Sequence, residues 1–189
     1  MISVEEKIED YIKNELTKLG LKYYTKTEMI NLEIEKALKD APSKNGGQGG
    51  NRPDIKLLIE DIPIIIEVKG NIDKLIKKYL DPSIPYDPSG KTDLFKLDMS
   101  YNAINSFACN GAIHYCNSII ANSHYDKGIA IGIAGNQICG KLNIIIWSYL
   151  IERDKEAKLL KDVSNKRDLT YLCNLKNYLE KENKNEISD

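Results

Sequence analysis

The sequence feature that most constrains the fold is a pair of short apolar runs, residues 55–59 and 64–68, separated by a stretch that can turn. Both runs are rich in isoleucine, which favours strands, so we expect a β-hairpin. The second run ends in Glu67-Val68-Lys69, and Asp54 directly precedes the first. Because side chains alternate along a strand, Glu67 and Lys69 are expected on one face, with the Asp54 carboxylate meeting Glu67 across the ladder.

Oxygen ligands of this kind suit a hard divalent cation. Two carboxylates and a backbone carbonyl can hold Mg²⁺, or Mn²⁺ in its place, while waters and phosphate oxygens fill the other positions. We therefore interpret Asp54 and Glu67 as metal ligands, with Val68 lending its carbonyl oxygen and Lys69 orienting the attacking water. Such a metal would lower the pKa of the water and neutralise charge on the phosphorane.

A simpler interpretation is open for the same residues. A Glu-x-Lys pair at the end of a strand is usually a solvated salt bridge. The surroundings favour the metal site, because a wholly apolar strand should not end in two charges on one face unless that end opens into a cleft. The preceding glycine-rich stretch, residues 46–52, is also suited to close approach of a ligand to the backbone.

The stretch from Pro53-Asp54 to Glu67-Val68-Lys69 resembles the PD-(D/E)xK superfamily of metal-dependent nucleases, which includes restriction endonucleases and junction resolvases. Residues 51–70 as a whole are most similar to the nuclease domains of type I restriction subunits and of type IIG enzymes, which fuse nuclease and methyltransferase. A second block, residues 107–117 followed by 130–136, resembles the helix and fourth strand of type IIG nuclease domains. The similarity runs over roughly residues 1–150.

The resemblance implies an α/β protein with a restriction-endonuclease-like mixed central sheet flanked by helices. It also implies a Mg²⁺-dependent deoxyribonuclease of restriction type, which hydrolyses double-stranded DNA by in-line attack of a metal-activated water. Two alternatives stay open. One is a repair or recombination nuclease of the same superfamily, and the other is a non-catalytic DNA-binding or assembly module that keeps the fold.

The N-terminal residues predict a helix. Ser3 and Glu6 form a capping box, an apolar stripe follows at helical spacing, and Gly20 ends the helix. In the resembling families a glutamate of this helix often joins the catalytic metal shell. Glu9 has a plausible spacing for that role, and Glu5 is nearly as good a candidate.

Residues 100–121 predict one helix with a polar face. Asn110 and His114 are four residues apart and share that face, so His114 is expected to contact a phosphate or orient the metal-bound water. Many of the resembling nucleases carry Gln-x-x-x-Tyr on this helix, near the catalytic site or the DNA. Tyr115 matches, but the position four earlier is Gly111. We predict Asn110, His114 and Tyr115 as DNA-binding residues, although a lone histidine on a polar helix face is more often structural.

Binding to DNA would depend on a local basic surface. The formal net charge of −1 gives no overall attraction to phosphate, which drives such binding. Arg52, two residues before Asp54, is a predicted DNA-binding residue. Further candidates are lysines of the flanking segments: Lys44, Lys74, Lys77, Lys78, Lys91 and Lys96. Each of these lysines taken alone is more often a solvated surface residue.

The rest of the chain completes the sheet. Residues 128–134 and 142–149 are apolar runs joined by a turn, which predicts a second hairpin. We assign residues 1–151 to the nuclease core and residues 152–189 to a charged helical extension or connector. The segment 81–90 contains three prolines and predicts a long loop that is either a DNA-facing flap or an insertion.

The remaining signals concern location and partners. The four cysteines form no Cys-x-x-Cys pair, and no signal peptide or membrane span is visible, so we expect a cytoplasmic protein without membrane contacts. No Asn-Pro-Pro-Tyr motif is present, so the chain is either a stand-alone nuclease or the excised or split part of an enzyme. We favour the latter, with a methyltransferase or specificity domain or subunit as partner. Cleavage of both strands needs two active sites, so a transient homodimer on DNA is expected.

Overall fold

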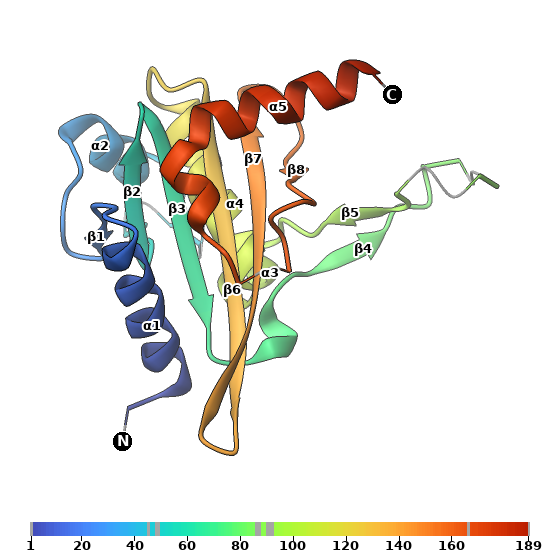
Figure 1. Ribbon diagram of the computed structural model, residues 1–189. Helices are drawn as coiled ribbons and strands as arrows, with labels where there is room; N and C mark the ends of the chain where they lie inside the picture. Colours follow the sequence, from blue (N-terminus) through green and yellow to red (C-terminus); the bar gives the residue numbers. More distant parts are fainter. Residues whose placement is uncertain are drawn as a thin grey trace.

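The computed structural model describes residues 2–44, 46–47, 50–85, 88–89, 93–165 and 167–188. Its centre is a six-stranded sheet of order β1-β2-β3-β6-β7-β8, with helices on both faces (Figure 1). The strands of this sheet are β1 (Tyr24–Thr25), β2 (Ile55–Ile59), β3 (Ile62–Lys69), β6 (Lys127–Ile138), β7 (Lys141–Glu152) and β8 (Lys158–Leu159). A separate two-stranded sheet consists of β4 (Lys78–Leu80) and β5 (Phe95–Leu97). The helices are α1 (Val4–Lys18), α2 (Leu32–Asp40), α3 (Tyr101–Ser106), α4 (Ala108–Ala121) and α5 (Leu175–Ser188), with the short 3₁₀ helices η1 (Ile72–Lys74) and η2 (Thr170–Asn174).

The expected hairpin of β2 and β3 is confirmed. Its two-residue turn, Glu60 and Asp61, has left-handed backbone angles (φ 49° and 67°), which match the twist of the flanking strands. β3 begins at Ile62, earlier than the sequence suggests, and therefore includes Pro63. The proline is tolerated because the pairing of β3 with β6 starts only at Ile64.

β3 and β6 run parallel, whereas the other pairs of this sheet in the described residues are antiparallel. A parallel pair needs a long connection, which here passes through β4, β5, α3 and α4. β3 and the paired part of β6 consequently end on the same side of the sheet, where β2 starts. The predicted mixed sheet flanked by helices is confirmed, and it is consistent with a restriction-endonuclease-like fold.

Side chains of β3 point alternately into two cores. Ile66 and Val68 pack with α1 on one face, and Ile65 packs with α2 and α4 on the other. Because both faces are covered, the strand is apolar along almost its whole length. The alternation places Glu67 on the face of α4.

The predicted single helix of residues 100–121 is wrong, because the segment forms two helices, α3 and α4. Phe107 between them is extended, with φ −121° and ψ 135°. The break lets the N–H of Cys109 donate to the carbonyl of Leu75 at 2.8 Å, while α4 packs on β3 and β6. A tertiary contact thus overrides a continuous helical periodicity.

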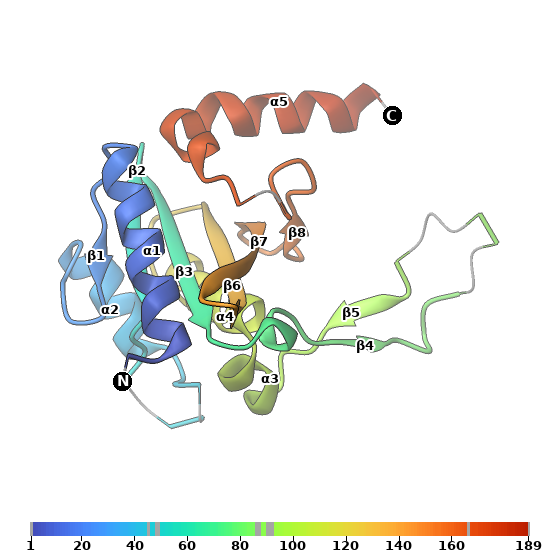
Figure 2. The ribbon, with the colours of Figure 1, turned by 60° about the horizontal axis from the view of Figure 1, so that its bottom comes forward.

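β4 and β5 form an arm that projects from the body of the protein (Figures 1 and 2). These two short strands flank the proline-containing loop, and the sequence pattern does not predict them. Tyr86, Asp87 and Gly90 of that loop, like Lys91 beyond it, lie outside the described residues. The choice between a flap and an insertion therefore stays a prediction.

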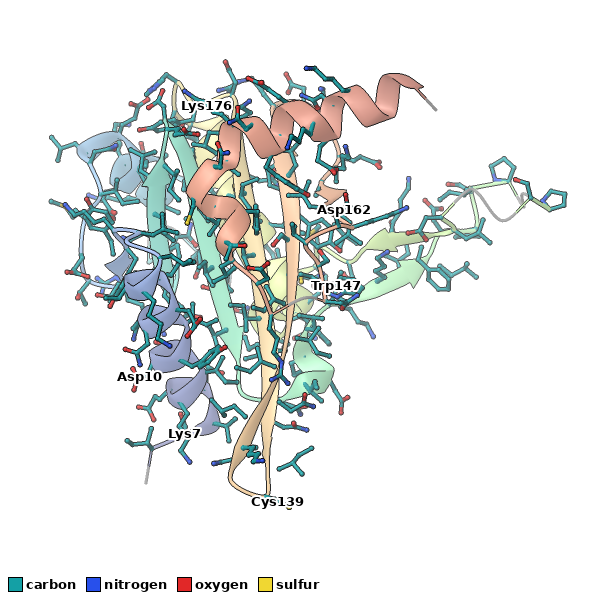
Figure 3. The ribbon with its side chains drawn as sticks, in the orientation of Figure 1. Lys7, Asp10, Cys139, Trp147, Asp162 and Lys176 are labelled. Atoms are coloured by element: carbon teal, nitrogen blue, oxygen red, sulfur yellow. The ribbon has the colours of Figure 1, made fainter. Side chains whose placement is uncertain are left out.

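β6 and β7 form a long hairpin whose tip, marked by Cys139, extends beyond the sheet (Figure 3). The turn consists only of Cys139 and Gly140, which have φ 48° and 79°. It is shorter than the turn expected from residues 135–141, because both strands continue toward the tip. Lys7 of α1 donates to the side chain of Gln137 at 2.8 Å and ties the helix to this hairpin.

The C-terminal segment packs on the same core as the rest of the chain. β8 forms an edge of the main sheet, and Leu160, Leu172 and Leu175 belong to the cluster that contains Ile66. The described part of the segment from residue 152 contains the helices η2 and α5, and its assignment as an extension of a nuclease core stays a prediction. Within the described part of the chain, no helix is both long and apolar enough to cross a bilayer.

His124 precedes β6 and lies at the other end of the strands, where it links its own loop to α2 and to the β2–β3 turn. Its Nδ1 lies 2.7 Å from Glu33 of α2, and its Nε2 lies 3.6 Å from Asp61 in the β2–β3 turn. The hydrogen bond with Glu33 raises the pKa of His124 above its ordinary value of 6.5, against the opposite effect of burial.

This geometry predicts a pH-dependent stability. Since the folded state holds the proton more tightly, the stabilisation is fully present below pH 6.5 and is lost as the pH rises through the folded pKa. We expect His124→Gln to destabilise the protein at pH 5.5 and to match the wild type more closely at pH 9, measured by urea unfolding. A difference that is the same at both pH values would contradict the contact.

Candidate active site

Asp54 and Glu67 meet where β2 starts and β3 ends. Ile55 pairs with Ile66, so Asp54 lies across from Glu67. The N–H of Asp54 donates to Glu67 Oε1 at 3.2 Å, and the N–H of Val68 donates to Asp54 Oδ2 at 2.8 Å. The structure thus brings together the two carboxylates that the sequence pairs, and a main-chain amide holds one oxygen of each.

The other oxygen of each carboxylate contacts a lysine ammonium. Lys26, in the turn after β1, lies 2.6 Å from Asp54 Oδ1, and Lys44, in the loop between α2 and β2, lies 2.5 Å from Glu67 Oε2. Asp54 and Glu67 are only 5% and 2% exposed. Buried charges of this kind need partners, and the two lysines provide them.

The electrostatics of the pair are set by its burial. Burial, and then the charge of Asp54, raise the pKa of Glu67 to about 7. The charges of Lys44 and Lys69 oppose this shift of the Glu67 pKa. Lys69 lies two residues after Glu67 on the same face of β3 and is partly exposed. The site therefore combines two buried carboxylates with a lysine that reaches solvent.

Glu9 is connected to this site by Lys26, whose ammonium lies near both Glu9 and Asp54. Glu9 Oε1 lies 3.7 Å from Lys26 Nζ, and Glu9 Oε2 lies 3.3 Å from Lys13 of the same helix. Glu5 instead accepts a hydrogen bond from the N–H of Gly70 at 3.2 Å, just past the end of β3. Glu9 is therefore the glutamate of α1 that shares a lysine with Asp54, and its place in a metal shell stays a prediction.

The predicted DNA contact of Asn110 does not fit the structure. Asn110 is completely buried, and the hydrogen bonds of its amide with the described residues all go to main-chain groups. It accepts from the N–H of Lys77 at 2.9 Å and donates to the carbonyls of Lys77 and Asp98 at 2.9 and 2.7 Å. Lys77 and Asp98 flank β4 and β5, so Asn110 clamps the base of the arm.

His114 and Tyr115 also differ from their predicted roles as DNA contacts. His114 is partly buried, and its Nε2 lies 3.0 Å from the carbonyl oxygen of Pro42, so it anchors a loop. Burial lowers the pKa of His114. Tyr115 is only 5% exposed, and its ring lies beneath Lys44, with 4.4 Å between Nζ and the ring centroid. Because α4 is buried on most of its surface, both residues face other parts of the protein. His114 contacts the loop at Pro42, and Tyr115 contacts Lys44.

Arg52 is exposed and remains a candidate for DNA contact. Together with Lys26 and Lys39 it lines an open depression of about 550 Å³. Lys26 also contacts Asp54, so this depression borders the carboxylate pair. Glu35 lines the depression as well, so three cationic side chains and one carboxylate face it.

No sequence pattern predicts Lys26 as a site residue, and Lys44 is predicted only as one of the candidate lysines of a DNA-binding surface. Neither residue belongs to a motif, and both reach the carboxylates from irregular segments. One signal for Lys44 was available. The glycine at position 111, where many of the resembling nucleases carry glutamine, leaves space beside Glu67 for another side chain.

The fold and the site together define a class: a mixed α/β protein with a carboxylate pair and a following lysine at the end of a central strand. Comparison with family models gives no match, and no solved structure matches at a significant level. A curated protein does match, the type II restriction enzyme and methyltransferase RM.BcgI of Heyndrickxia coagulans, at 27% identity over 166 residues. The match covers 87% of this chain but 24% of RM.BcgI, so the chain spans about a quarter of that relative's length. This similarity relates the chain to restriction enzymes in general.

Proposed function

We propose that the chain is a metal-dependent endonuclease of restriction type, of the PD-(D/E)xK kind, that hydrolyses double-stranded DNA. The geometry of Asp54 and Glu67 carries the proposal. One oxygen of each carboxylate is held by a backbone amide, and the other faces a positive charge. Lys69 lies on the same face as Glu67, so the groups that a metal-activated water requires are adjacent.

The donor set fits Mg²⁺ or Mn²⁺. Asp54 Oδ1 and Glu67 Oε2 are hard oxygen ligands, and each already contacts a cationic group. The carbonyl of Val68 is a third donor, because the N–H and C=O of a strand residue point to the same side and the N–H of Val68 points to Asp54. Among the described residues, no group of three or more His, Cys, Asp or Glu side chains is placed to hold a metal, so waters would complete the coordination.

Each side chain has a distinct task in this proposal. When bound, the metal would neutralise charge on the phosphate and lower the pKa of the attacking water. Lys69 would donate a hydrogen bond to that water and stabilise the developing negative charge. Glu9 would hold Lys26 beside Asp54 or join the metal shell, and Arg52 would bind a neighbouring phosphate.

The relative supports the proposed partners. Its name joins a restriction enzyme and a methyltransferase in one protein. We assign this chain to the cutting function, with a methyltransferase or specificity domain or subunit as its partner. Cleavage of both strands would use a transient dimer on DNA, since one site cuts one strand.

The proposed function is tested by cleavage of supercoiled plasmid by the purified chain. We expect nicking that requires Mg²⁺ or Mn²⁺, stops with EDTA and is absent from Asp54→Ala. Equal nicking by the wild type and the variant would identify a contaminant and reject the proposal. Preference for branched DNA over duplex would favour a repair or recombination nuclease, and binding of duplex without cleavage would favour a non-catalytic module.

A further inference from the structure

Lys44 is the most enclosed cation of the carboxylate pair. Its side chain is 14% exposed, against 47% for Lys26 on the other carboxylate. Its ammonium lies 2.5 Å from Glu67 Oε2 and 4.4 Å from the centroid of the Tyr115 ring. The ring face and the carboxylate both attract a positive charge, so the ammonium is held from two directions.

The loop that carries Lys44 is fixed by side chains from other segments. Asn105 of α3 donates to the carbonyl of Lys44 at 2.9 Å. His114 of α4 contacts the carbonyl of Pro42 at 3.0 Å, and Asn51 donates to the same carbonyl at 3.0 Å. These contacts position the backbone on both sides of residue 43, so the direction of the Lys44 side chain follows from the fold.

Gly111 provides the space that the ammonium occupies. A Cβ atom at this position would lie 3.0 Å from the carbonyl oxygen of Ile104, 3.0 Å from Lys44 Nζ and 3.3 Å from Glu67 Oε2. These distances are shorter than ordinary van der Waals contacts, so a larger residue would displace the flexible ammonium or the end of α3. The glycine and the lysine therefore act together, one opening the space and the other filling it.

We propose that Lys44 is an internal counter-ion that competes with the divalent cation for Glu67 and thereby sets the metal affinity of the site. This inference rests on the proposed function. Glu67 Oε1 accepts from the N–H of Asp54, and Lys44 contacts Oε2. A metal on Oε2 would share this oxygen with the ammonium, and two cations on one oxygen repel each other, so each would weaken the other's contact with Glu67.

The inference predicts the effect of removing the charge. Lys44→Met and Lys44→Gln are expected to bind Mn²⁺ about tenfold more tightly than the wild type in isothermal titration calorimetry, because a charge-assisted contact no longer competes. Without metal, both variants should melt at a lower temperature, since Glu67 then lacks its partner. Mn²⁺ should raise their melting temperature more than that of the wild type. Lys176→Met, an exposed lysine of α5 at the far end of the protein (Figure 3), controls for the change in net charge.

The possible outcomes are distinct. Tighter binding by both Lys44 variants and unchanged binding by Lys176→Met support the inference. Measurable binding that is unchanged or weaker in the Lys44 variants overturns the inference and leaves the proposed function standing. Absence of Mn²⁺ binding from the wild type and from both variants would reject the metal site itself, and the inference with it.

Discussion

Asp54→Asn is expected to lose both metal binding and DNA cleavage, whereas Lys69→Met is expected to lose cleavage and retain metal binding. Asp54 supplies a proposed ligand oxygen, and its neutral amide counterpart keeps the shape but not the charge. Lys69 contacts neither carboxylate oxygen in the described hydrogen bonds and ion pairs, and it lies at the exposed end of β3. Its proposed task concerns the attacking water, so its loss should reduce the cleavage rate on the order of 10³-fold.

Two measurements on the same preparations check this separation. Initial rates of plasmid nicking report cleavage, and calorimetric titration with Mn²⁺ reports binding. Circular dichroism and urea unfolding show whether each variant is folded, and Lys176→Met serves as the matched lysine control. Unchanged cleavage by Lys69→Met would remove Lys69 from the mechanism. Normal Mn²⁺ binding by Asp54→Asn would remove the carboxylate from the metal site.

Gly132→Ala is expected to destabilise the fold by about 3 kcal/mol, because β6 approaches α4 too closely for a side chain. Gly132 pairs with Glu67 in the parallel ladder. A Cβ atom there would lie 2.5 Å from the backbone nitrogen of Cys109 and still closer to its sulfur. Because the obstacle includes main chain, no change of rotamer can relieve it, and α4 would have to move away from the sheet.

Urea unfolding measures this effect as a lower midpoint at an unchanged slope. Gly47→Ala is the control, since among the described residues its methyl group would meet Ser43 Oγ at an ordinary distance of 3.6 Å. A loss below about 0.5 kcal/mol in Gly132→Ala would mean that α4 and β6 are not in direct contact. The variant should also weaken the site, because α4 carries Gly111 and Tyr115.

The sequence predicts those parts of the site that depend on strand geometry. Asp54 and Glu67 come together because a two-residue turn fixes the register of β2 and β3, and a register places alternate residues on known faces. Similarly, Ser3 and Glu6 form the predicted capping box, with hydrogen bonds of 3.1 and 2.7 Å. These features are local in the chain, so periodicity and turn chemistry suffice.

Other parts depend on contacts that periodicity does not encode. Helical periodicity predicts Asn110 on a polar, DNA-binding helix face, but the separate helix α4 turns that face toward the base of the arm. Lys26 and Lys44 reach the carboxylates from irregular segments whose path is set by tertiary contacts. The strands β4 and β5 are three residues each and are separated by a long loop, so neither gives a recognisable alternation.

Asp54 exchanges two hydrogen bonds with the Glu67-Val68 segment. The amide and carboxylate of Asp54 therefore extend the pairing of β2 with β3 by one residue. Beyond Ile55 the backbone of β2 ends, and the Asp54 side chain takes over the pairing with the Val68 amide. A slip of one residue would move Glu67 to the face of Ile66 and remove both bonds. The two carboxylates are therefore held together only when the strands are correctly aligned, so closing the hairpin in register is also what assembles the proposed metal site.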